Sequence, residues 1–250
     1  MLNAIKRWIS GGPTGTDWSG VAEWAQKQGH GFKRAKDDEG FVIDGSFVGR
    51  PWRLEWGPPQ RAYITAQELR IRMELQLSSS LQMLVMSRVL MEMLERETFE
   101  RYTQSNQTLI DVSTPEEMRW LAMFPKVNLD LPKSVRGNFA AVSSDPQNAL
   151  AWVDSNFGLQ LAHASLNLLR DQPPFVIMTL RGRVYMRLQL ETPDPVLISQ
   201  AVDLFQAAAQ SALRVGGAVQ EGSASGDWPS TASTAWQTDL MPEDPKDRRQ

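Results

Sequence analysis

The residues best suited to binding chemistry are arginines on predicted β-strands. Segments 52–56 and 68–77 alternate between apolar and polar residues, the pattern of strands that bury one face. A hairpin at 175–190 adds a further strand. Guanidinium groups bind carboxylates and phosphates through paired hydrogen bonds, so several on one sheet face would hold an anion or an acidic protein segment. The polar positions carry Arg53, Arg70, Arg72 and Arg187, with Tyr185 beside them.

Acidic residues at the same polar positions allow a different interpretation. Glu55, Glu68 and Glu74 share the phase of these arginines. Cross-strand ion pairs would explain the pattern on an exposed sheet without any ligand. Both interpretations remain open at this level. Further arginines fall at predicted turns or strand ends, namely Arg50, Arg61, Arg181 and Arg183.

Metal binding and catalysis have little support in the sequence. The chain has no cysteine, which excludes disulfides, thiolate zinc sites and cysteine nucleophiles. Its two histidines, His30 and His163, lie in different segments without metal-ligand spacing. The densest carboxylates are Asp37–Glu39, which predict a solvated turn, and the pair Glu116–Glu117. We therefore predict no metal site, no cofactor and no catalytic residue, and favour a protein that is not an enzyme.

A capping motif accounts for the pair Glu116–Glu117. The sequence Thr114-Pro-Glu-Glu117 predicts a helix start in which Glu117 binds back to the amide of the cap residue. Two other helices are predicted to begin in the same way, with a capping aspartate followed by proline as the first helical residue. These starts are Asp145-Pro146 and Asp194-Pro195.

The C-terminal tail, residues 216–250, has the composition of a disordered segment. It nevertheless contains Trp228 and Trp236, and aromatic residues are normally scarce in disordered chains. Short peptides around these tryptophans are typical of motifs that fold into a partner's groove. The alternative is that they pack back onto the body of the protein.

The charge distribution argues against a nucleic-acid partner. The chain has a net charge of −3, and the tail alone contributes six acidic and three basic residues. The remaining residues are therefore neutral in sum. Non-specific binding to nucleic acid needs an excess of positive charge, so we expect no specific nucleic-acid partner.

The N-terminal residues 1–9 form a short amphipathic segment, followed by a Gly-rich linker to residue 15. They lack the apolar stretch of a signal peptide, and no later window is long and apolar enough for a transmembrane helix. We therefore expect a cytoplasmic protein. Segment 1–9 could contact a membrane surface or pack on the body of the protein. Its small apolar area favours packing.

The predicted fold class is α+β, with antiparallel β-hairpins packed on helices and a disordered C-terminal tail. The globular domain is expected over residues 16–215. Its hairpins near 41–56 and 175–190 share a pattern, which allows two related halves, 16–110 and 111–215. A helix is predicted over 81–99, with four methionines, Met83, Met86, Met91 and Met93, as core residues or as an adaptable binding groove.

Several short blocks resemble those of a proteobacterial protein family to which no function has been assigned. The resemblance spans about residues 15–215 and implies a bacterial cytoplasmic protein, without an activity or a functional residue. The blocks are Phe41–Gly45, Arg50–Gly57, Gln60-Arg61, Glu68–Arg72, Glu117–Trp120 and Arg181–Arg183.

The functional prediction is a non-enzymatic interaction or adaptor protein with an unidentified protein partner. It would use the tail tryptophans and the arginine-bearing sheet face. The alternative is a protein that binds a small anionic ligand, or an enzyme that grips an anionic substrate, with the same arginines.

Overall fold

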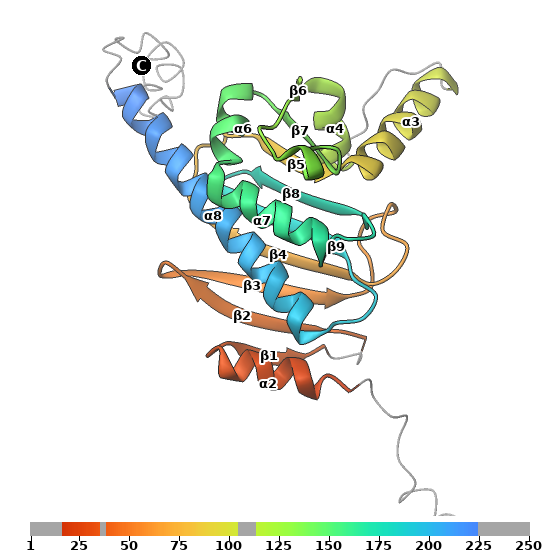
Figure 1. Cartoon of the computed structure of the whole chain (residues 1–250), viewed down its shortest axis with the longest axis vertical. Helices are drawn as coiled ribbons and strands as arrows, with labels where there is room; N and C mark the ends of the chain where they lie inside the picture. Colours follow the sequence, from red (N-terminus) through yellow and green to blue (C-terminus); the bar gives the residue numbers. More distant parts are fainter. Residues whose placement is uncertain (1–16, 36–38, 105–113, 225–250) are drawn as a thin grey trace, which may run out of the picture. The chain divides into compact units, whose positions relative to one another are not determined.

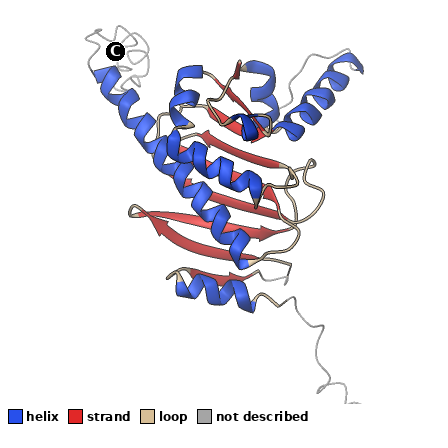
Figure 2. Cartoon of the chain, viewed as in Figure 1, coloured by secondary structure: helices blue, strands red, loops and turns tan. Residues whose placement is uncertain are grey.

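The computed structural model describes residues 17–35, 39–104 and 114–224 of the chain. The chain divides into two compact units, 1–216 and 217–250. The first contains one nine-stranded antiparallel sheet with helices packed against it (Figures 1 and 2). This architecture confirms the predicted α+β class and the packing of antiparallel hairpins on helices.

The strands follow the order β1-β2-β3-β4-β9-β8-β5-β7-β6 across the sheet. Strands from the predicted second half therefore lie on both sides of β5, and the two halves share one sheet. The strands are β1 (Gly31–Arg34), β2 (Phe41–Phe47), β3 (Arg50–Gly57), β4 (Glu68–Glu74), β5 (Met83–Ser87), β6 (Lys126–Val127), β7 (Phe139–Ser143), β8 (Phe175–Leu180) and β9 (Arg183–Gln189).

The two predicted hairpins are present, and their turns are alike. Val48-Gly49 joins β2 to β3, and Arg181-Gly182 joins β8 to β9. All four turn residues have positive φ, at 51° and 70° in the first turn and 51° and 79° in the second. Such two-residue turns match the twist of antiparallel strands, and glycine accepts the left-handed backbone at the second position.

One face of the sheet is apolar along its whole width. Its central row reads Ile43, Leu54, Ile71, Met186 and Ile177 across the registered strands, and each of these side chains is at most 1% exposed. Helices α7 and α8 lie across this face (Figure 1). The helices are α2 (Ser19–Lys27), α3 (Arg88–Gln104), α4 (Glu116–Met123), α5 (Lys133–Arg136), α6 (Pro146–Trp152), α7 (Ser155–Leu166) and α8 (Pro195–Ala224).

The opposite face is divided into a covered part and an open part. Over β8, β5 and β7 it carries apolar side chains that form a second core with α3 and α4. Leu84 and Met178 contribute from the strands, Leu90 from α3 and Trp120 from α4. Over β2, β3 and β4, and on the neighbouring strand β9, the same face carries charged residues instead. Antiparallel sheets tolerate such a solvated face, because only one face must join the core.

The predicted helix over 81–99 is wrong in its first part. Residues Met83–Ser87 form strand β5, and the helix α3 begins at Arg88. The methionines therefore do not share one helix: Met83 and Met86 are buried on β5, while Met91 is buried and Met93 is 41% exposed on α3. The physical reason is that β5 lies between β8 and β7 with both faces covered, so its sequence has no alternation.

The predicted start of α8 is confirmed, but its end is not. The Asp194 side chain accepts hydrogen bonds from the backbone amides of Val196 and Leu197 at 2.7 and 3.3 Å. The helix continues to Ala224, so the predicted tail boundary at residue 216 falls inside it. Trp228 and Trp236 lie outside the described residues, as does segment 1–9. Within the described ranges, none of the helices has the length and apolar character needed to cross a membrane.

Candidate functional site: an arginine-bearing sheet face

The open part of the sheet brings the predicted arginines together through strand register. Arg53 on β3 pairs with Arg72 on β4, and Arg70 on β4 pairs with Arg187 on β9. Tyr185 on β9 is the other neighbour of Arg72. Side chains of registered residues point to the same face, so all five predicted residues share one surface. We call this surface the arginine face.

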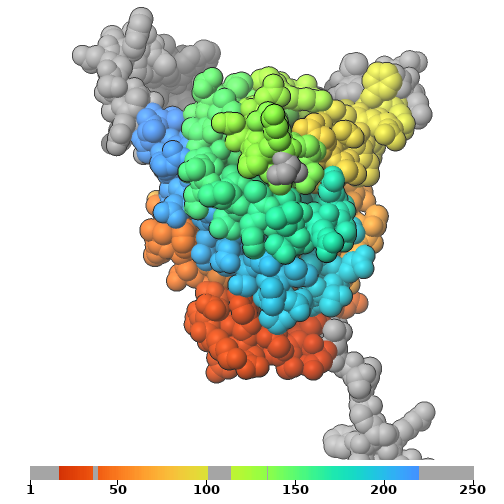
Figure 3. Space-filling model, viewed as in Figure 1, coloured from red at the N-terminus to blue at the C-terminus, as the bar shows by residue number. Residues whose placement is uncertain are grey.

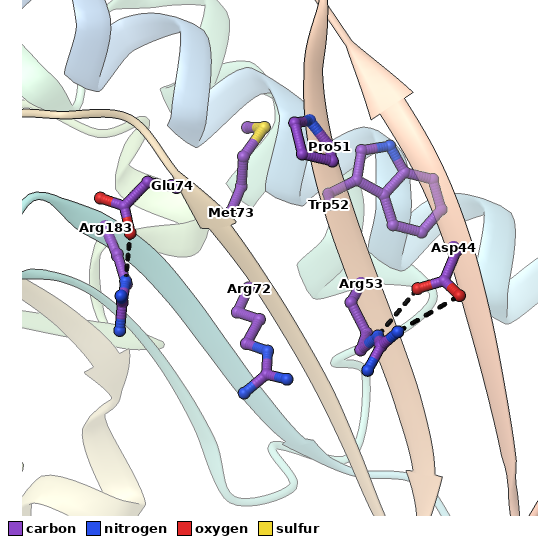
Figure 4. A pocket seen from close by; sticks show the side chains of 8 residues that line it. All are labelled: Asp44, Pro51, Trp52, Arg53, Arg72, Met73, Glu74 and Arg183. Carbon is purple, nitrogen blue, oxygen red and sulfur yellow. Dashed lines mark hydrogen bonds and ion pairs between the residues drawn. The ribbon is translucent and has the colours of Figure 1, made fainter.

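Three exposed arginines surround a hollow at one end of the arginine face (Figure 4). Arg53, Arg72 and Arg183 are 43%, 56% and 50% exposed. The hollow has a volume of about 360 Å³ and lies open to solvent. It is lined by Asp44, Pro51, Trp52, Arg53, Arg72, Met73, Glu74 and Arg183.

Acidic neighbours hold two of these three guanidinium groups. Arg53 makes a two-pronged contact with Asp44, from Nε at 2.8 Å and from Nη2 at 3.4 Å. Arg183 donates to Glu74, and also to the Tyr185 hydroxyl at 3.2 Å. Arg72 makes a weaker ion pair, in which its Nη2 lies 3.6 Å from a carboxylate oxygen of Glu55. It is therefore the guanidinium most available to a ligand.

The pair of Arg53 and Asp44 remains ionised at neutral pH. The Arg53 guanidinium, through its hydrogen bond, holds the pKa of Asp44 below its ordinary value. The Asp44 carboxylate in turn raises the pKa of Arg53. A ligand carboxylate would therefore compete with Asp44 for a fully charged arginine, since each charged form stabilises the other.

The other end of the arginine face is anchored at a buried carboxylate. Glu68 is 0% exposed and accepts from Arg187 Nη1 at 2.5 Å, Arg70 Nη1 at 3.2 Å and the Gln60 amide at 2.6 Å. Arg70 and Arg187 are only 17% and 19% exposed. A buried carboxylate needs such donors, because an unpaired charge away from water is very costly. These two arginines are therefore structural in the described state.

A second buried carboxylate ties the segment before β4 to α4. Glu117 is 1% exposed and accepts from Arg61 Nε at 2.7 Å and from the Tyr63 hydroxyl at 2.6 Å. Burial, followed by the Glu117 charge, raises the pKa of Tyr63, so its hydroxyl stays protonated and donates. The predicted capping role of Glu117 is wrong. The cap residue is Pro115, which has no amide proton for Glu117 to bind.

The structure separates the five predicted residues into two kinds. Arg53 and Arg72 are exposed at the hollow, whereas Arg70 and Arg187 are held at Glu68. Tyr185 is partly buried against the core under α3 and α4. The ion pairs foreseen as the alternative are present, with Arg70 also 3.4 Å from Glu55. An arginine assigned only to a turn, Arg183, proves to belong to the hollow.

The chemistry available at the hollow is recognition of anions. Guanidinium groups present planar donors that match carboxylate or phosphate oxygens. In the described parts of the chain, no three histidine, aspartate or glutamate side chains come together to hold a metal ion. The hollow itself contains two carboxylates, Asp44 and Glu74, and each lies beside an arginine.

Comparisons with known proteins assign neither a family nor a function. No protein-family model matches the chain, and no curated protein matches it. One solved structure with partial similarity is the mycobacterial trehalose monomycolate transport factor A, TtfA. It is 10% identical, with a TM-score of 0.44, and the match covers 79% of this chain and 94% of that one. We draw nothing about function from it.

Proposed function

We propose that the protein is a non-enzymatic, cytoplasmic interaction protein that binds an acidic segment of a partner protein through its arginine face. The observation that carries this proposal is the open hollow with Arg53, Arg72 and Arg183 at its rim. Counting Lys33, six basic side chains lie on the arginine face against four acidic ones, a local charge of +2 in a chain of net charge −3. The basic residues are Lys33, Arg53, Arg70, Arg72, Arg183 and Arg187, and the acidic ones are Asp44, Glu55, Glu68 and Glu74.

A protein segment fits this surface better than a single small anion. The exposed guanidinium groups come from three adjacent strands, β3, β4 and β9, so they form a row rather than converge on one point. An extended acidic segment can offer a carboxylate to each, and can exchange with Asp44 and Glu74 as it docks. Each ion pair at the rim would contribute little binding free energy, and several of them together would hold the segment, as in many charged interfaces.

A small anionic ligand is the second candidate, and the size of the hollow favours it. Its volume of about 360 Å³ lies within the range of small-molecule sites. Against it stands the wide opening to solvent, since ligand pockets usually bury most of the ligand surface. A metabolite that raises the melting temperature of the wild type, but not of Arg72→Gln, would support this candidate.

The tail tryptophans remain a proposed second contact for the partner. Trp228 and Trp236 would supply the apolar anchors that an arginine-rich surface lacks. A chain ending at Ala224 keeps all of α8 and removes both tryptophans. Weaker partner binding by this shortened chain, with an unchanged melting temperature, is the expected result.

The direct test is site-specific photo-crosslinking in the native host. A photoreactive amino acid in place of Pro51, which is exposed and lines the hollow, leaves all three arginines intact and is expected to capture one acidic protein, whereas the same group at Arg170 should not. Arg170 is an exposed arginine in the turn after α7, outside the arginine face, and serves as the matched control. Identical crosslink patterns from both positions, or none from position 51 at full expression, would overturn the proposal.

A further inference from the structure

A second surface of interest lies on the outer side of α7 and α8. Leu159 and Leu166 on α7 are 64% and 69% exposed, and Val196 at the start of α8 is 62% exposed. Seven residues separate the two leucines, so they lie on the same side of their helix. Asp203 on α8 lies close enough to His163 on α7 for the two side chains to interact, so the two helices adjoin here.

This surface is acidic as well as apolar. Asp203 is exposed on α8, and Glu191 and Asp194 are exposed just before its first residue, Pro195. Neither α7 nor the described part of α8 before Arg214 contains a lysine or an arginine. An occupant that covers these apolar residues should therefore carry basic side chains together with large apolar ones.

The chain itself contains a segment of this chemistry at its N-terminus. Residues 2–9 include Leu2, Ile5, Trp8 and Ile9 together with the basic pair Lys6-Arg7. The segment lies outside the described residues, and a linker of seven residues, 10–16, joins it to Asp17. A linker of that length spans at most about 24 Å.

The start of α2 places that linker beside the acidic apolar surface. A Cβ atom built on Gly20 would lie 3.4 Å from Cγ of Pro195, so the first turns of α2 and α8 are in contact. Figure 3 shows the light-blue start of α8 directly against the red α2. From Val196 to Asp203 the surface extends only about 10 Å along the helix. The part of the surface on α8 is thus within reach of the linker.

We infer that residues 2–9 dock as an amphipathic helix on the outer side of α7 and α8 of the same chain, with Lys6 and Arg7 toward Asp194 and Asp203. Docking covers Val196, Leu159 and Leu166 and pairs the opposite charges. The inference is independent of the arginine face, which lies on the other side of the sheet.

Spin-label distances test this directly, because the chain has no native cysteine. Nitroxides on the double variant Asn3→Cys/Ser199→Cys are expected to give one short, narrow distance distribution. The matched pair Asn3→Cys/Ser46→Cys, with Ser46 at the far end of β2, should give a longer distance. A tenfold excess of unlabelled chain should leave the short distance unchanged.

Two additional variants decide between occupants. Adding Leu166→Asn and Val196→Asn to the first pair should broaden the distribution while the melting temperature stays near that of the wild type. A broad distribution in the original pair would overturn the inference. Loss of the short distance on dilution would overturn it in favour of a second copy, and its appearance only with anionic vesicles would overturn it in favour of a membrane surface.

Discussion

Replacing Glu68 by alanine is expected to lower the free energy of unfolding by about 3 to 5 kcal/mol. The carboxylate is fully buried and accepts from two arginines and one backbone amide. Its removal leaves Arg187 beside Arg70 without the shared carboxylate and leaves Arg70 with Glu55 at 3.4 Å, and both arginines are mostly buried. Removing one partner of a buried charge cluster costs far more than the cluster contributes, because the remaining charges lose their compensation.

The matched control for this prediction is Glu74→Ala. Glu74 lies on the same strand and the same face and also pairs with an arginine of β9, but its side chain is 44% exposed. Solvent compensates Arg183 when the carboxylate is removed, so we expect no measurable loss of stability. Urea unfolding followed by circular dichroism compares the two variants. Equal effects of the two substitutions would show that burial of Glu68 does not control the cost.

Replacing Glu117 by alanine should cost about 2 to 3 kcal/mol, through the loss of charge-assisted hydrogen bonds. Tyr63 is 8% exposed, and its hydroxyl would keep no partner in the described structure. Arg61 is less affected, because its side chain is 27% exposed and can reach water. The loss should therefore arise mainly from the unpaired hydroxyl of Tyr63. In a chain that already carries Tyr63→Phe, Glu117→Ala should lower the free energy of unfolding by much less.

The adjacent residue provides the control for this second prediction. Glu116 lies in the same first turn of α4, but it pairs with Arg119 at 2.6 Å and Arg181 at 3.4 Å near the surface. Glu116→Ala should change the free energy of unfolding by less than about 1 kcal/mol. If the capping interpretation of the sequence were correct, the two alanine variants would show similar small losses in thermal unfolding.

The alternating strands were the most predictable part of the fold. In β3 and β4 the apolar residues face the core and the charged ones lie on the opposite face, so a period of two marks both the strands and their orientation. The starts of α6 and α8 were predictable for a similar reason. Asp145 and Asp194 accept from backbone amides next to proline, which is a local signal that needs no tertiary information.

The central strands were not predictable by the same means. β5 and β7 are buried on both faces, and each of their residues is at most 7% exposed. Strands of this kind have no polar phase, so β5 merged with the following helix and β7 was missed. The short edge strands β1 and β6 were missed as well, since two to four residues are too few for a periodic pattern.

The candidate site was only partly predictable, because it depends on register between distant strands. The arginines were identified from their phase, but their division into exposed and buried pairs was not. Glu68 and Glu74 have the same phase in β4, and only the Gln60 amide and the surrounding packing make Glu68 fully buried. Glu117 was misassigned because its partners, Arg61 and Tyr63, lie more than 50 residues away in the sequence.

The most direct test of the proposed function is the affinity of the protein captured at position 51 for three purified forms of the chain. Arg53→Gln/Arg72→Gln/Arg183→Gln should bind it about tenfold more weakly than the wild type. Asp44→Asn/Glu74→Gln should bind it more tightly, because the competing carboxylates are gone and the arginines are free. Equal affinity of all three forms would contradict the role of the arginine face.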